Sequence, residues 1–155
     1  MRKGRLKEYC EAEFENIEAV LAELTSLMVS GKLEYSTPEL AALATFIHNC
    51  YNGVENVLKR ILIYESKELP DSATWHKGLL EMAAAKGIID ESLHERLSVY
   101  LSFRHFFVHA YSFALKWKEL KPLAEGIAET IVDFKKATSG YVKNLSRVQT
   151  KETPP

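Results

Sequence analysis

At 155 residues, the chain has the length of a single domain and can bury a sizeable core. Hydrophobic residues make up 46% of it and charged residues 26%, as in ordinary soluble globular proteins. The net charge is −1, so no overall positive field draws the chain to nucleic acid or membranes, and a nucleic-acid contact requires a local basic cluster.

The chain opens with a basic segment, residues 1–5, which is followed by glutamates rather than by an apolar stretch. This order is not that of a secretory signal peptide. No apolar run approaches the roughly 18 residues that a membrane span needs. We therefore expect a cytoplasmic protein that does not insert into membranes. Cys10 and Cys50 lie on apolar helix faces, and we expect buried thiols rather than a disulfide or a catalytic cysteine.

Two long helices are predicted in the first half of the chain. Apolar residues recur at steps of three and four over about residues 6–28, and Ser30-Gly31 ends this helix. The second helix is expected over about residues 38–64. It is preceded by Ser36-Thr37-Pro38-Glu39, which is typical of an N-cap, an N1 proline and an acidic first turn.

A polar stripe follows one side of the second predicted helix, and it consists of His48, Asn52, Glu55 and Lys59. One interpretation is a solvated face with a Glu–Lys pair at i,i+4, worth a few tenths of a kcal/mol. The other is a supporting part of a functional site that presents a carboxylate and an amide to Arg104.

Three further helices are predicted in the second half. Asp71 or Ser72 caps a short helix that ends at Lys86-Gly87. Asp90 opens a helix that should reach about Leu115, and a basic connector over residues 116–122 leads to the last helix. These elements predict an all-α, antiparallel bundle of four long helices and one short helix. We expect one domain over residues 1–149 and a disordered tail over residues 150–155.

The fourth predicted helix carries an arginine, Arg104, at the centre of an apolar stripe. At about 100° per residue, the apolar side chains of this stripe lie within about 60° of Arg104. An unpaired guanidinium in a core is costly, so Arg104 needs an acidic partner or a wet cleft. The stripe consists of Leu93, Leu97, Tyr100, Leu101, Phe107, Val108 and Tyr111.

The same helix has a polar face and a second apolar face. The polar face includes His105 and His109. A helix that is apolar on two sides is covered on two sides, and a second copy of the chain is the simplest cover for the second one. We therefore expect a homodimer. The second apolar face consists of Val99, Phe103, Phe106, Ala110 and Phe113.

The residue types of this helix limit its chemistry. His105 and His109 have the i,i+4 spacing of two zinc ligands, but no glutamate follows His105 and a third ligand would have to be a distant side chain. We therefore expect no metal site. No motif supports a serine or cysteine nucleophile, and the seven glycines are scattered rather than gathered in a phosphate loop, so we expect no cofactor.

The chemistry that remains for this helix is that of an arginine and a histidine acting without a metal. Arginine binds phosphate and balances charge on its oxygens, and histidine transfers protons near neutral pH. The pair suits cleavage of RNA, in which the 2′-hydroxyl is a built-in nucleophile. The alternative is a buried Arg104 that pairs with Glu55, and a histidine that only forms hydrogen bonds.

The spacing Arg104-x4-His109, with His105 directly after the arginine and Tyr111 two residues after the histidine, resembles the R-x4-H-x-Y motif of HEPN-superfamily toxins. Further blocks resemble the HepT-like branch of ribonuclease toxins, and together they span about residues 40 to 125. These blocks are residues 51–56, residues 75–82 and residues 121–123.

The resemblance implies a helical bundle that dimerises, with two copies of the motif facing each other across one cleft. It implies a metal-independent endoribonuclease in which Arg104 binds the phosphate, His109 is the general acid or base, and His105 supports the site. It also implies a small nucleotidyltransferase antitoxin as partner, which attaches AMP to Tyr111. RNA is then the substrate, and DNA is not, because it lacks the 2′-hydroxyl.

Two features of the helical wheel bear on this function. Arg104 and His109 lie about 140° apart on an ideal helix, so either the helix is distorted or each cleft takes residues from both chains. Tyr111 lies at almost the same angle as Arg104, so we expect its hydroxyl to point into the same cleft. A non-catalytic helical protein that binds nucleotides or the partner through a degenerate motif stays open as the alternative; a closed core around Arg104 would favour it.

Overall fold

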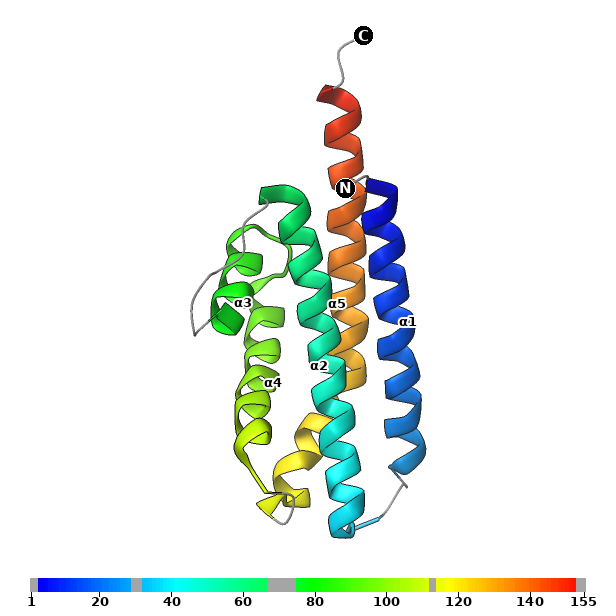
Figure 1. Cartoon of the computed structure of the whole chain (residues 1–155), viewed down its shortest axis with the longest axis vertical. Helices are drawn as coiled ribbons and strands as arrows, with labels where there is room; N and C mark the ends of the chain where they lie inside the picture. Colours follow the sequence, from blue (N-terminus) through cyan, green and yellow to red (C-terminus); the bar gives the residue numbers. More distant parts are fainter. Residues whose placement is uncertain (1–2, 29–31, 67–74, 112–113, 153–155) are drawn as a thin grey trace.

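The computed structural model describes residues 3–28, 32–66, 75–111 and 114–152. Within these ranges the chain forms five α-helices and no strand (Figure 1). The all-α class and the pattern of four long helices and one short helix are therefore confirmed. The helices are α1 (Lys3–Leu27), α2 (Thr37–Ser66), α3 (Trp75–Ala85), α4 (Glu91–His109) and α5 (Trp117–Glu152).

The centre of the bundle is α2. Within the described ranges it is the one helix that contacts each of the other four. In Figure 1, α1 and α5 run beside it on one side, while α3 and α4 lie on the other. This position requires apolar side chains around most of the helix, and α2 supplies many of the fully buried ones. Examples are Leu43, Ile47, Cys50, Val54, Leu58, Ile61 and Leu62.

Several helix ends follow local sequence signals. The Glu39 backbone N–H donates to Ser36 Oγ at 3.2 Å, and the Ser36 N–H donates to Glu39 Oε1 at 2.8 Å. This reciprocal capping box begins α2 at Thr37, one residue before the predicted start. Asp90 accepts a backbone N–H from the first turn of α4. Gly87, with a φ of 77°, lies just after α3, as expected for a residue that ends a helix.

The end of α4 differs from the prediction. The sequence predicts a helix to about Leu115, but α4 ends at His109, and Ala110 has an extended backbone with φ −93° and ψ 149°. Leu115 is buried. The next helix, α5, begins two residues later, at Trp117. Tertiary packing thus overrides a local sequence that contains no helix stop signal.

The last helix is longer than predicted at both ends. The expected connector is largely helical, because α5 begins at Trp117 and includes Pro122. At the other end, α5 continues to Glu152, into the stretch expected to be a disordered tail, and residues 153–155 lie outside the described ranges. The predicted caps of α3, Asp71 and Ser72, also lie outside them. In the described part of the chain, no helix combines the length and the apolar composition needed to cross a membrane.

Candidate functional site

Arg104 is half-buried on α4, three residues before Phe107, whose ring packs against His48 of α2. Its Nε atom is buried and has no hydrogen-bond partner among the described residues. In the same part of the chain, the guanidinium forms no ion pair with a carboxylate. The predicted alternative of a buried Arg104 paired with Glu55 is therefore wrong. A positive charge held in this way is available to an anion.

The charge of Arg104 affects the pKa of two side chains of α2, His48 and Tyr51. Burial lowers the pKa of His48, the charge of Arg104 lowers it further, and Glu55 raises it. Burial also raises the pKa of Tyr51 far above its usual value, with a further contribution from Glu55, whereas Arg104 lowers it. Both side chains therefore lie within the electrostatic reach of a cation and of an anion.

The contact between α2 and α4 leaves several polar atoms unsatisfied. His48 packs its ring against Phe107, with the ring centroids 5.0 Å apart. The Nδ1 atom of His48 and the hydroxyl of Tyr51 are buried and, like the Nε of Arg104, lack a partner of good geometry in the described ranges. A buried polar atom that is left without any partner costs about 1–3 kcal/mol in general. Clusters of this kind occur at functional sites more often than in ordinary cores.

Glu55 is only 3% exposed and pairs with His76 of α3. Both carboxylate oxygens lie 2.9 Å from His76 Nδ1, which must therefore carry a hydrogen and donate it. The prediction that Glu55 belongs to a solvated stripe with Lys59 is wrong, because Glu55 is buried and Lys59 lies over the ring of Trp75 at 4.5 Å. Asn52, the other predicted member of the stripe, is half-buried.

His105 and His109 lie together on an exposed side of the last two turns of α4. Their rings meet edge to face, with centroids 5.1 Å apart. Because α4 is helical up to His109, the side chain of His109 leaves the helix about 140° away from that of Arg104. One chain by itself therefore directs the arginine toward α2 and the two histidines toward solvent.

Tyr111 lies two residues beyond the end of α4 and is 74% exposed. The helical angle that relates it to Arg104 in the sequence therefore does not apply, and the prediction of a shared direction on one helix is wrong. The alternative of a core tyrosine is also wrong. Val108, predicted in the core stripe, is exposed as well, because it lies in the last turn of α4.

The second apolar face of α4 is in large part open. Val99 is 54% exposed and Phe106 43%, whereas Phe103 between them is buried by its own chain. The prediction that Phe103 needs a second copy as cover is therefore wrong. A groove of about 260 Å³ runs beside these residues, between α4 and the start of α5. Ala110 is half-buried, and Phe113 lies outside the described residues.

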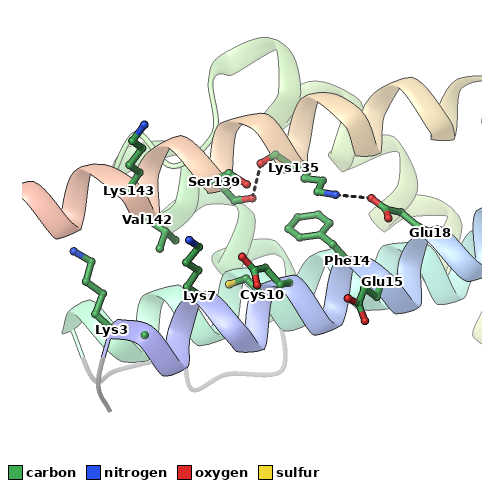
Figure 2. A pocket seen from close by; sticks show the side chains of 13 residues that line it. Lys3, Lys7, Cys10, Phe14, Glu15, Glu18, Lys135, Ser139, Val142 and Lys143 are labelled. Atoms are coloured by element: carbon green, nitrogen blue, oxygen red, sulfur yellow. Dashed lines mark hydrogen bonds and ion pairs between the residues drawn. The ribbon is translucent and has the colours of Figure 1, made fainter.

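A second, larger groove of about 800 Å³ lies between α1 and α5, and Figure 2 shows its lining. Cys10 and Phe14 contribute to its floor, and a Lys135–Glu18 ion pair of 2.6 Å crosses one part of it. Burial raises the pKa of Cys10 to about 11, so the thiol is protonated near neutral pH and weakly nucleophilic. None of the site residues predicted from the sequence lines this groove.

The described residues contain no group of three or more His, Cys, Asp or Glu side chains arranged to hold a metal ion. Sequence reasoning did not single out Tyr51, on which the charge of Arg104 acts, or His76, which pairs with Glu55. Both fall in the blocks that carry the family resemblance, which is the signal that points to them.

Comparison with known proteins identifies the family of the chain. A family model described as HepT-like protein matches residues 42–145, from the first turns of α2 into the second half of α5. No curated protein and no solved structure matches the chain. The family match includes the cluster of α2, α3 and α4 around Arg104, and it covers more than half of the 155 residues. The chain belongs to the HepT-like family.

Proposed function

We propose that this protein is a metal-independent endoribonuclease toxin that is controlled by a small nucleotidyltransferase antitoxin. The observation that carries the proposal is Arg104, a half-buried arginine without a carboxylate partner in the described ranges. Structural arginines in a helical core are paired. An unpaired arginine, on a helix that also carries two exposed histidines, suits a phosphate that arrives with a substrate.

The proposed reaction needs only groups that RNA and the protein supply. The ribose 2′-oxygen attacks the adjacent phosphorus, and the bond from phosphorus to the 5′-oxygen breaks, which yields a 2′,3′-cyclic phosphate and a 5′-hydroxyl. Arg104 pairs with the non-bridging oxygens and stabilises the charge that builds up on them. One base removes the proton of the 2′-hydroxyl and one acid protonates the leaving oxygen. We assign one of these transfers to His109.

We assign the complete site to a dimer. Arg104 and His109 of one chain leave α4 in different directions, so one phosphate is more easily gripped by Arg104 of one copy and His109 of the other. The exposed Val99 and Phe106 and the groove beside them supply an apolar contact surface on the same helix. His105, in ring contact with His109, orients it.

We assign control to Tyr111. Its side chain is 74% exposed beyond the end of α4, where a second protein can reach it. Attachment of AMP there would bring a phosphate and an adenosine to the end of the helix that carries His105 and His109. The phosphate competes with RNA for nearby cations, and the adenosine blocks access to the histidines.

Single substitutions test the proposed activity. Arg104→Ala and His109→Ala should each lower RNA cleavage by about 10²- to 10⁴-fold and leave the helical content unchanged. His94→Ala, a half-buried histidine of the same helix, is the matched control and should stay active. Cleavage should persist in EDTA, and DNA of the same sequence should stay intact. An active His109→Ala variant or a chelator-sensitive activity would contradict the mechanism. RNA or nucleotide binding without cleavage by the wild type would favour the non-catalytic alternative.

A further inference from the structure

Glu55 is a buried carboxylate of α2 that can compete with a phosphate for Arg104. Tyr51 and Glu55 are four residues apart on α2, so their side chains are neighbours on one face. Both Glu55 and Arg104 act electrostatically on Tyr51 and on His48. The ring of His48 also packs against Phe107, which follows Arg104 by three residues on α4, so Glu55 and Arg104 act on the same part of the contact between α2 and α4.

A direct Glu55–Arg104 pair would be strong in this environment. Glu55 is 3% exposed, and attraction between opposite charges grows as water is excluded. An arginine neutralised in this way has little remaining affinity for phosphate. Because Glu55 and Arg104 do not pair, some other contact must satisfy the carboxylate.

That contact is His76. Its Nδ1 donates to Glu55, and both carboxylate oxygens lie 2.9 Å from it. The side chain of His76 is 20% exposed, so it approaches Glu55 from the edge of the bundle. The ring of Trp75 lies 3.6 Å from that of His76, centroid to centroid. The imidazole is thus held between a carboxylate and an aromatic ring.

We infer that His76 is a positioning residue that holds Glu55 away from Arg104 and thereby keeps the arginine free for an RNA phosphate. The inference rests on the proposed function and adds a residue of α3 to it. His76 itself does not touch the substrate. Its removal should let Glu55 capture Arg104, so the loss should depend on the presence of both charges.

The availability of Arg104 for phosphate can be measured as the affinity for a mixed-sequence 2′-O-methyl RNA oligonucleotide, because this probe offers phosphates but cannot be cleaved. The full chain with His76→Ala should bind it about tenfold more weakly than wild type. His76→Asn, which retains a donor close to the position of Nδ1, should bind like wild type. Glu55→Gln should bind more tightly, and His76→Ala with Glu55→Gln should match Glu55→Gln alone. Glu81→Ala, an exposed position on the same helix, is the control.

The outcomes separate this inference from the proposed function. If Arg104→Ala binds the probe as wild type does, the phosphate-binding role of Arg104 fails, and the role of His76 fails with it. If Arg104→Ala loses binding while His76→Ala does not, or while Glu55→Gln fails to rescue His76→Ala, only the inference is overturned. Should His76→Ala not fold, weaker binding by Glu55→Gln or by His76→Asn overturns it on its own.

Discussion

Arg104 shows how far a single residue can be interpreted from sequence. An arginine at the centre of an apolar stripe predicts either a buried pair or a cleft, and the structure has the guanidinium half-buried and unpaired within the described residues. The apolar neighbours at the start of its stripe, such as Leu93 and Leu97, are buried as predicted. The prediction of burial is wrong at the end of the stripe, at Val108 and Tyr111, because α4 ends at His109 and helical angles do not apply beyond that residue.

Glu55 and His76 show what periodicity does not reveal. Glu55 has the helical spacing that places it on the same side of the helix as His48 and Asn52, and this spacing favours a solvated stripe. It also directly follows the buried Val54, and its burial depends on α3, a helix that docks from elsewhere in the chain. A contact between residues 55 and 76 is set by how helices pack, and the spacing within one helix carries no information about it.

Tyr111 carries the prediction about control. Co-expression with a nucleotidyltransferase partner should add the mass of AMP to a peptide that contains Tyr111, because this side chain is 74% exposed. The Tyr111→Phe variant should lack the added mass and should stay toxic in the presence of the partner. Peptide mass spectrometry reports the modification. An unmodified Tyr111 in a fully neutralised complex would show that the partner acts by occlusion.

At the scale of elements, the closest approach of α1 to α2 yields a prediction. A Cβ atom at Gly53 would lie 2.5 Å from Cγ1 and 2.7 Å from Cδ1 of Ile17. Ile17 is buried and cannot move away freely. Gly53→Ala should therefore lower the free energy of unfolding by about 1–3 kcal/mol, measured by urea denaturation, although alanine favours helices.

Gly140 in α5 is the matched control. A Cβ atom there meets nothing within 4 Å, so Gly140→Ala should raise the free energy of unfolding by up to about 1 kcal/mol. A neutral or stabilising Gly53→Ala would show that α1 and α2 pack less closely than described.

The boundaries of the helices separate what local sequence can predict from what it cannot. Ser36 and Asp90 cap the starts of helices with their own side chains. Gly87 follows the end of α3 with a positive φ. These boundaries depend on single residues and can therefore be predicted from the sequence. The end of α4 has no such residue. It is set by the burial of Leu115 and by the return of α5, which depend on the assembled bundle.

At the scale of the whole molecule, the open apolar face of α4 predicts a dimer. Phe106→Glu places a charge on a side chain that is 43% exposed, so it should leave the bundle folded and yield monomers in sedimentation velocity. Val132→Glu changes a valine of α5 that is 51% exposed, and it should leave the dimer intact. A monomeric wild type, or a dimeric Phe106→Glu variant, would contradict the assigned surface.

The central claim is that Arg104 and His109 of different chains form one ribonuclease site, and mixing two inactive variants tests it most directly. When Arg104→Ala and His109→Ala chains are unfolded together in equal amounts and refolded, about half of the dimers should contain one chain of each kind. Each mixed dimer has one intact site and one that lacks both residues, so the mixture should recover about a quarter of wild-type RNA cleavage. No recovery at any mixing ratio, with mixed dimers shown to be present, would contradict a site shared between two chains.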